Sequence, residues 1–189
     1  MLTGGPGTGK SSVLRALTTL LDNEGVEHGA IESEQLAWGT PWLPDERVHE
    51  QLAAICRLQR AYGRRLFLVA ATTETEAHLR RLLAAVAAER SLVACLRAPG
   101  DVAAARVLAR EPERWAGRDA LAAHARELAD AIPRLPGIDL VLDTDDRDEE
   151  EVAAELREAV AARGLFDARS GLTGSDVGAT RRGRRHPLR

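Results

Sequence analysis

The feature that most constrains this chain is a short run near its start, Gly4-Gly5-Pro6-Gly7-Thr8-Gly9-Lys10-Ser11. The run satisfies the spacing G-x-x-x-x-G-K-[ST]. Glycines let the backbone curl until successive N–H groups point at phosphate oxygens, and a following helix adds the positive end of its dipole. The run therefore predicts a phosphate-binding loop (P-loop) between a strand and a helix. The alternative is a glycine-rich turn that only caps a helix.

Each part of this loop has an expected role toward ATP, or a close relative of ATP, and Mg²⁺. The Lys10 ammonium is expected to reach the β and γ phosphates, and the Ser11 hydroxyl to bind Mg²⁺. Lys10 is also the only lysine among the 26 basic residues of the chain. The residues expected to contact the nucleotide are Gly5, Pro6, Gly7, Thr8, Gly9, Lys10, Ser11 and Ser12.

Five short apolar runs predict strands, and helical patterns fill the intervals between them. An alternation of strands and helices with wholly apolar strands predicts a parallel sheet covered on both faces, which is a three-layer αβα P-loop fold. In that fold the first strand is central, yet it has only three residues, so we expect the true start to lie upstream. The expected strands are 1–3, 26–32, 66–71, 92–96 and 138–142. The expected helices begin at Lys10, near Val48, near Glu74, at Asp101, after Gly117 and near Asp148.

Length and charge predict one domain and a tail. Residues 1–166 have the size and apolar content of a single nucleotide-binding domain, and residues 167–189 form a basic stretch expected to be disordered. The net charge of −3 combines +4 in the tail with −7 in the domain. Nucleic-acid binding is therefore disfavoured, apart from a minor alternative in which the tail is a contacting arm.

The apolar segments also bear on location. No apolar run reaches the roughly 18 residues of a membrane span, and no leader precedes the P-loop, so a cytoplasmic protein is expected. Cys56 and Cys95 lie in apolar surroundings without metal-ligand spacing and are expected to be reduced core residues.

Several classes of P-loop protein carry characteristic motifs, and the absence of such a motif disfavours the class. A guanine-reading Asn-Lys-x-Asp motif needs a second lysine, and the Leu-Ser-Gly-Gly-Gln signature of transport ATPases is absent. Hydrolytic motors usually end the third strand in acidic residues, but here the apolar run ends at Ala71 and the first carboxylate, Glu74, comes three residues later. These observations disfavour GTPases, transport ATPases and motors.

The chain resembles the compact P-loop kinases of small molecules, which include nucleoside monophosphate, shikimate, gluconate and adenylylsulfate kinases. The resemblance rests on the P-loop run and on the layout of strands through about residue 163. It implies transfer of the ATP γ-phosphoryl to a small hydroxyl- or phosphate-bearing acceptor. One alternative is a regulatory module that hydrolyses the nucleotide slowly and thereby switches a partner protein. The lowest-ranked alternative is a protein that binds nucleic acid.

The resemblance implies acidic residues at the end of the second strand, where Glu32 and Glu34 stand. On an extended chain the i, i+2 spacing places both carboxylates on one side. One is expected to accept the acceptor's proton and the other to support Mg²⁺ through water. A solvated strand end is the alternative.

The resemblance also implies an arginine-bearing lid, which matches the stretch from Arg106 to Arg118. Arg110 and Arg114 are the expected phosphate contacts, and Arg118 is either a lid arginine or a charge at a helix start. Solvated arginines are the alternative.

The acceptor pocket is expected after Glu34, near Glu74, with Trp38, Pro41 and Trp42 either stacking on a flat substrate or covering the sheet end. The resemblance implies that Asp143, Thr144 and Asp145 contact adenine, mostly through their backbone. His28, His49, His78 and His124 are interpreted as surface or hydrogen-bonded residues. The sequence sets neither the acceptor nor the oligomeric state.

Overall fold

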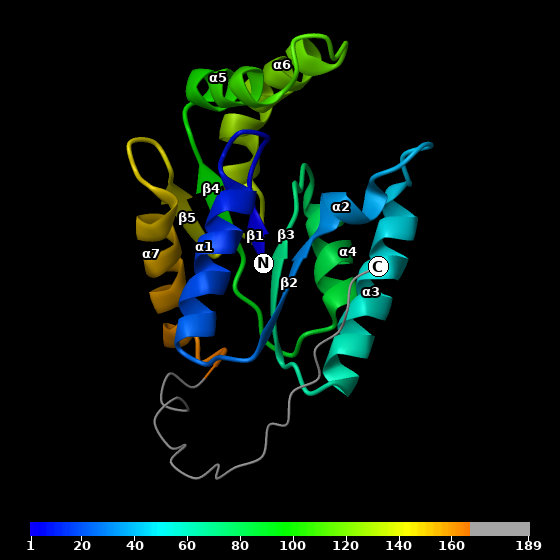
Figure 1. Cartoon of the computed structure of the whole chain (residues 1–189), viewed down its shortest axis with the longest axis vertical. Helices are drawn as coiled ribbons and strands as arrows, with labels where there is room; N and C mark the ends of the chain where they lie inside the picture. Colours follow the sequence, from blue (N-terminus) through cyan, green and yellow to red (C-terminus); the bar gives the residue numbers. More distant parts are fainter. Residues whose placement is uncertain (167–189) are drawn as a thin grey trace, which may run out of the picture.

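The computed structural model describes residues 1–166, and the predicted tail from 167 to 189 lies outside the described residues. Five parallel strands form one sheet in the order β2-β3-β1-β4-β5, with helices on both faces (Figure 1). The predicted three-layer α/β fold with a central first strand is therefore confirmed. The strands are β1 (Leu2–Thr3), β2 (His28–Glu32), β3 (Leu66–Ala70), β4 (Ala94–Arg97) and β5 (Leu140–Asp143).

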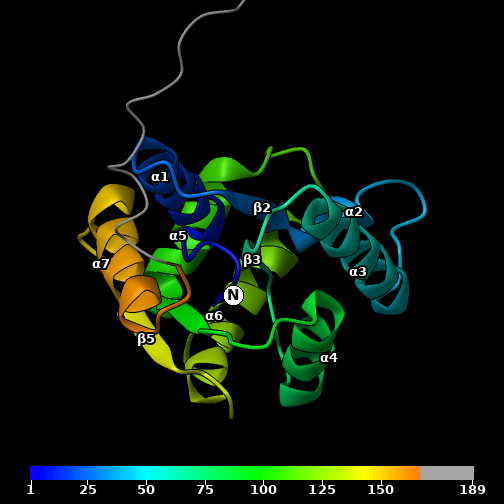
Figure 2. The ribbon, with the colours of Figure 1, turned by 90° about the horizontal axis from the view of Figure 1, so that it is seen from below.

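The helices divide between the two faces of the sheet. In the view from below, α1 and α7 cover one face, while α4 and α6 lie across the sheet from them (Figure 2). Helix α3 packs with α4 against β2 and β3. The helices are α1 (Lys10–Asn23), α2 (Ser33–Ala37), α3 (Asp45–Ala61), α4 (Glu76–Val86), α5 (Gly100–Arg110), α6 (Arg118–Ala131), a 3₁₀ turn η1 (Ile132–Arg134) and α7 (Glu149–Ala162).

Strand β3 explains why the strands are apolar throughout. Leu66 and Leu68 pack into the core beneath α1 and α7, whereas Val69 packs into the core beneath α3 and α4. Successive side chains of a strand point to opposite faces, so a sheet buried on both sides needs apolar residues at every position.

The predicted strand starts are two residues early for β2, β4 and β5, because the preceding residues make other hydrogen bonds. The N–H of Val26 binds the Leu21 carbonyl and completes the end of α1. The N–H of Val93 binds Asp139 Oδ2 at 2.8 Å. These apolar residues lie beside the core without extending the ladder, which is why apolar runs overestimate the strands.

Helix α3 corrects a second expectation. Its apolar spacing predicts one face containing Val48, Leu52, Ile55, Leu58 and Tyr62. Leu52 is fully buried, but Leu58 is 55% exposed and Tyr62, just past the helix, is 86% exposed. The buried residues of α3 are Val48, Leu52 and Cys56. Leu58 is two residues beyond Cys56, about 200° around the helix, so it points away from the sheet.

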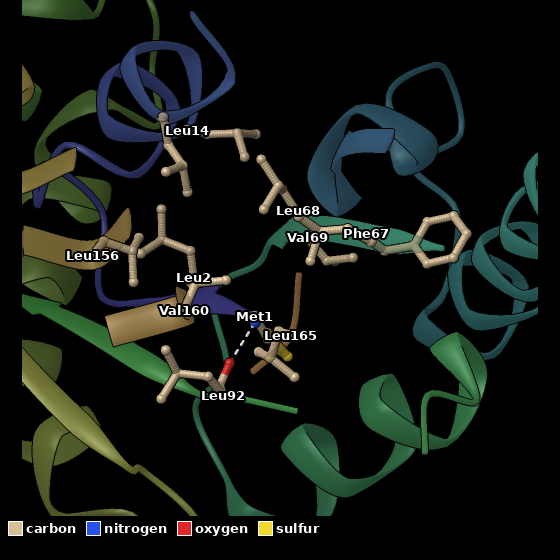
Figure 3. A pocket seen from close by; sticks show the side chains of 12 residues that line it. Met1, Leu2, Leu14, Phe67, Leu68, Val69, Leu92, Leu156, Val160 and Leu165 are labelled. Atoms are coloured by element: carbon tan, nitrogen blue, oxygen red, sulfur yellow. Dashed lines mark hydrogen bonds between the residues drawn. The ribbon is translucent and has the colours of Figure 1, made fainter. Parts of the chain in front are cut away.

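A small apolar cavity of about 40 Å³ lies at the amino end of the sheet, between the strands and helices α1 and α7. Figure 3 shows the side chains that line it and the Met1 ammonium, which donates a 2.6 Å hydrogen bond to the Leu92 carbonyl. The cavity is lined by the starts of the strands, whereas the P-loop follows the end of β1. It is a packing gap in the core and no part of the candidate site.

Both cysteines are buried and free, as predicted. Burial raises the pKa of the Cys95 thiol to about 11. Within residues 1–166, no helix combines the length and apolarity that a bilayer crossing requires.

Candidate nucleotide-binding and phosphoryl-transfer site

The P-loop joins the carboxyl end of the central strand β1 to α1 (Figure 1). From β1 the chain passes to α1 on one face, and from the neighbouring β3 it passes to α4 on the opposite face. The loop therefore lies at the topological switch point of the sheet, where ligands bind in open α/β folds.

Steric constraints explain the glycines of the loop. Gly7 has φ 79° and Gly9 has φ 89°, both in the left-handed region that favours glycine. A Cβ on Gly7 would lie 2.2 Å from the Ala103 carbonyl oxygen of α5. A Cβ on Gly4 would lie 2.5 Å from the Leu96 carbonyl oxygen. The close approach of α5 at Gly7 and of β4 at Gly4 leaves no room for a side chain, and the positive φ at Gly7 and Gly9 favours glycine.

The start of α1 is open to an anion. Gly9 caps the helix without a side-chain hydrogen bond, and no acidic residue occupies the first turn. The N–H groups of Lys10, Ser11 and Ser12 have no hydrogen-bond acceptor among the described residues. The other described α-helices all carry an acidic residue in the first turn. The unpaired N–H groups and the helix dipole make this end the natural place for phosphate.

Lys10 folds back over the loop. Its Nζ donates hydrogen bonds to the carbonyl oxygens of Gly4 at 3.0 Å and Gly5 at 3.1 Å. Burial lowers the pKa of Lys10, the charge of Glu34 acts in the opposite direction, and the nearby Arg110 lowers it further. The ammonium is thus in place beside the open helix end, within electrostatic range of both a predicted carboxylate and a predicted lid arginine.

Glu32 and Glu34 are both near the loop, but not as the extended-chain argument predicts. The chain turns into α2 at Ser33, so Glu32 ends the strand and Glu34 lies in the first turn of a helix. Glu32 Oε2 accepts a 2.8 Å hydrogen bond from the Ser11 hydroxyl. Glu34 Oε1 accepts a 2.7 Å bond from the N–H of Thr72. The two carboxylates are therefore held by different elements. The prediction that they lie on one side of an extended chain is wrong.

Three consecutive residues after β3 each contact a different element. Thr72 binds Glu34, the Thr73 hydroxyl lies 2.7 Å from the Thr3 hydroxyl, and Glu74 Oε1 lies 2.8 Å from His124 Nε2 of α6. Thr72 and Thr73 are not among the predicted site residues, although two threonines directly after an apolar strand are a usable signal in the sequence. His124 is hydrogen-bonded, as interpreted.

Of the arginines after β4, Arg106 contacts the P-loop and the loop after β5. Arg110 and Arg114, the predicted phosphate contacts, make few contacts. Arg106 Nη1 lies 3.5 Å from the Gly7 carbonyl and 3.1 Å from Thr144 Oγ1, and Nη2 donates to the Thr144 carbonyl at 2.8 Å. Arg110 pairs with Glu111 at 2.7 Å. Arg114 is exposed and has no hydrogen bond or ion pair among the described residues.

Arg118 begins α6 and is a structural residue here. Its guanidinium donates to the Leu108 carbonyl near the end of α5 at 2.6 and 3.1 Å. Of its two predicted roles, the geometry matches the charge at a helix start.

The tryptophans after α2 are exposed. Trp38 is 75% and Trp42 61% solvent-accessible, so the alternative in which they cover the sheet end is wrong. Across residues 1–166, no cluster of three or more His, Cys, Asp or Glu side chains is arranged to hold a metal ion. Any divalent cation here would need oxygen atoms from a ligand as well.

No protein-family model matches the chain, and no curated protein sequence matches it significantly. Solved structures do. A sugar kinase from Janibacter sp. matches with 17% identity and a TM-score of 0.61, over 88% of this chain and 96% of that one. The APS kinase CysC from Mycobacterium tuberculosis, in complex with AMPPNP and APS, matches with 21% identity and a TM-score of 0.59, over 85% and 95%.

Shikimate kinase from Acinetobacter baumannii, in complex with shikimate, matches with 16% identity and a TM-score of 0.55, over 87% of this chain and 94% of that one. The fold is therefore that of the P-loop small-molecule kinases, as the sequence resemblance predicted.

Proposed function

We propose that the chain is an ATP-dependent phosphotransferase that acts on a small hydroxyl- or phosphate-bearing acceptor. One observation carries the proposal: the left-handed glycine loop leaves the N–H groups at the start of α1 without acceptors and places Lys10 beside them. A polyphosphate supplies the acceptors and the negative charge that this arrangement lacks. The kinase fold favours phosphoryl transfer over other uses of the same loop.

The residues at the loop also fit a magnesium ion. Ser11 and Glu32 bring a hydroxyl and a carboxylate oxygen within 2.8 Å of each other beside the phosphate cradle. Mg²⁺ prefers such oxygen ligands and is usually held by one or two protein groups together with substrate phosphates and waters. Ser11 would hold the ion directly and Glu32 through water. When bound, Mg²⁺ would neutralise charge on the phosphates.

In the proposed reaction, an acceptor oxygen forms a bond to the γ-phosphorus while the bond to the β–γ bridging oxygen breaks, and ADP leaves. A hydroxyl acceptor loses its proton to a carboxylate, and we propose Glu34 for this role. The hydrogen bond from Thr72 fixes one Glu34 oxygen, and the Ser33 hydroxyl lies 3.3 Å from the other. Lys10 and the loop N–H groups would hold the transferring charge.

The arginines after β4 take separate parts in this proposal. Arg106 ties the Gly7 carbonyl to Thr144 and thereby fixes the P-loop relative to the loop after β5. Arg110 and Arg114 would contact the phosphates once the segment closes, because both are exposed and Arg110 already influences Lys10. Closure of such a segment would exclude water from the transferring phosphoryl group.

Isothermal titration calorimetry with Mg²⁺ and ATP or ADP tests the proposal, with Lys10→Ala as the matched variant. Wild type should bind, and Lys10→Ala should lose turnover by at least about 100-fold while its circular dichroism stays native, because the charge on the transferring group loses its main protein partner. ADP release across candidate acceptors then measures transfer. Absence of binding by wild type, or full activity of Lys10→Ala, would overturn the proposal. ADP release that no acceptor stimulates would favour the regulatory alternative.

A further inference from the structure

The orientation of Glu34, the proposed base, depends on segment 72–74, the three residues that follow β3 and its neighbour Ala71. The Thr72 N–H donates a 2.7 Å hydrogen bond to Glu34 Oε1 and holds that oxygen from outside α2. Within residues 1–166 the other hydrogen bond to this carboxylate comes from Ser33, its neighbour in the chain, at 3.3 Å. The place of the carboxylate is therefore set mainly by where segment 72–74 lies.

Two further contacts hold the segment itself. Its middle residue, Thr73, is buried, and its hydroxyl lies 2.7 Å from the hydroxyl of Thr3 at the end of β1. Its last residue, Glu74, reaches α6, where Oε1 lies 2.8 Å from His124 Nε2. The contact of Thr73 involves no titratable group, whereas the contact of Glu74 joins two. The Glu74–His124 pair is thus the anchor of the segment whose strength depends on charge.

Helix α6 gives His124 a fixed position beside the P-loop. Ala125 and Leu128 are buried, and a Cβ on Gly5 would lie 3.3 Å from Leu128 Cβ and 3.8 Å from the Ala125 carbonyl oxygen. His124 is one turn before Leu128, so the two side chains share a side of the helix. Helix α5 packs alongside α6 (Figure 1). The His124 ring therefore reaches Glu74 from a helix that packs directly on the phosphate-binding loop.

The charged groups around His124 favour its protonated form. Glu74 lies 2.8 Å from one ring nitrogen, and Glu127, one turn later on α6, lies 3.5 Å from the other. The neighbouring Arg126 is paired with Asp101 of α5 at 2.8 Å. The hydrogen bonds to the two glutamates raise the pKa of His124, although partial burial opposes the shift. An imidazolium donates from both nitrogens and a neutral imidazole from only one, so loss of the proton weakens the anchor.

We infer that His124 is a positioning residue for Glu34 in the proposed phosphoryl transfer. Its bond to Glu74 fixes segment 72–74, whose first N–H holds the base. The inference rests on the proposed function for the role of Glu34, and His124 acts through other residues, not on the substrate. A charge-assisted hydrogen bond is stronger than a neutral one, so the protonated ring holds the segment more firmly. Turnover should therefore fall as the pH rises and the ring loses its proton.

Hydrogen exchange measured by NMR tests this coupling without an acceptor. The quantity compared is the protection factor of the Thr72 N–H, which removes the intrinsic pH dependence of exchange, at pH 5.5 and pH 8.5. In wild type it should be about two- to threefold lower at pH 8.5, as expected for a partly exposed charged pair. His124→Gln should give the lower value at both pH values. His124→Lys keeps a positive charge at both and should give the higher value at both.

His28→Gln is the matched control. It makes the same chemical change at the start of β2, whereas the P-loop lies at the opposite edge of the sheet, where the strands end. Thr72 protection in this control should equal that of wild type, and Glu74→Gln should reproduce His124→Gln. Equal Thr72 protection in wild type and His124→Gln at both pH values would overturn the inference.

ADP release from ATP and Mg²⁺, with water as the acceptor, then connects position to turnover. His124→Gln should lower kcat by about two- to threefold at pH 5.5 and leave KM for ATP unchanged, because the loss is again that of one partly exposed pair. His124→Lys should restore kcat and remove the fall toward pH 8.5. A raised KM for ATP with unchanged kcat would place His124 in nucleotide binding and overturn the inference. A wild type that binds no nucleotide would overturn the proposed function, while the Thr72 measurement would still decide whether His124 positions Glu34.

Discussion

The Ser11 hydroxyl donates a 2.8 Å hydrogen bond to Glu32 Oε2, and this bond joins the first turn of α1 to the last residue of β2. It connects the residue expected on Mg²⁺ to the first of the two predicted carboxylates. Glu34, two residues later, is held instead by the N–H of Thr72. The different partners predict different kinetic effects for the two carboxylates.

Glu32→Gln should raise the Mg²⁺ concentration needed for half-maximal activity, because the amide binds a magnesium-bound water more weakly. Glu34→Gln should lower kcat by about 10²-fold or more, with the Mg²⁺ requirement unchanged, because general-base catalysis contributes about 10²–10⁴-fold. Steady-state kinetics against Mg²⁺ at fixed ATP measures both effects. Wild-type rates in both variants would remove the carboxylates from the mechanism.

Gly7→Ala should destabilise the fold and abolish nucleotide binding. The added methyl group would lie 2.2 Å from the Ala103 carbonyl oxygen, so either the loop or α5 must move. Gly25→Ala is the control, because Gly25 also has positive φ but no atom lies within 4 Å of the place that its new methyl group would occupy. We expect the control to lose about 1–2 kcal/mol from left-handed strain alone.

Urea unfolding and calorimetry with ATP separate the two glycine variants. The Gly7 variant should show the larger loss of unfolding free energy together with the loss of binding, and the Gly25 variant should keep its affinity. Equal affinity in both variants would mean that close contact between the loop and α5 is not needed for binding.

The sequence predicts those strands and helices whose apolar residues repeat regularly along the chain. The alternation of apolar strands and amphipathic helices gave the layered sheet, because burial on both faces leaves a signal at every strand position. The P-loop spacing located the site, because the positive φ angles at Gly7 and Gly9 favour glycine and leave a fixed glycine pattern in the sequence. Helix α2 has only five residues, too few to show a helical period in the sequence, so the sequence pattern predicts extended chain at Glu34.

The remaining contacts of the site depend on which side chains meet in space. The local sequence around Arg106, Arg110 and Arg114 does not show that only Arg106 reaches Gly7 and Thr144. The link from Glu74 to His124 spans 50 residues and two helices. Neither contact produces a repeating pattern in the sequence. Both can be identified only from the three-dimensional structure.

The contact between His124 and Glu74 predicts a pH-dependent contribution to stability. The hydrogen bond that His124 donates to Glu74, assisted by the one to Glu127, raises the pKa of His124 above its usual value, although partial burial opposes the shift. A raised folded-state pKa means that the contribution is fully present below the unfolded-state pKa, near 6.5, and is lost as the pH rises through the higher folded-state value. Both side chains are more than a third exposed, so the contribution should be only a few tenths of a kcal/mol.

Unfolding free energies of wild type and His124→Gln at pH 5.5 and pH 8.5 measure this contribution. The difference between the two proteins should be larger at the lower pH. Glu74→Gln should reduce that pH dependence, because it removes the main cause of the shift. A difference that grows toward higher pH would contradict the sign of the effect.

Two leucines of α3 test whether the buried face of that helix is assigned correctly. Leu52 is fully buried and packs with Cys56 and Val69 against the sheet, whereas Leu58 is 55% exposed. Leu52→Ala should lower the free energy of unfolding by about 2–5 kcal/mol, because it removes apolar contacts and leaves a cavity. Leu58→Ala, with the same chemical change on the same helix, should cost no more than about 0.5 kcal/mol. Comparable losses in urea denaturation would mean that the end of α3 is covered in solution, and that the apolar stripe in the sequence described it correctly.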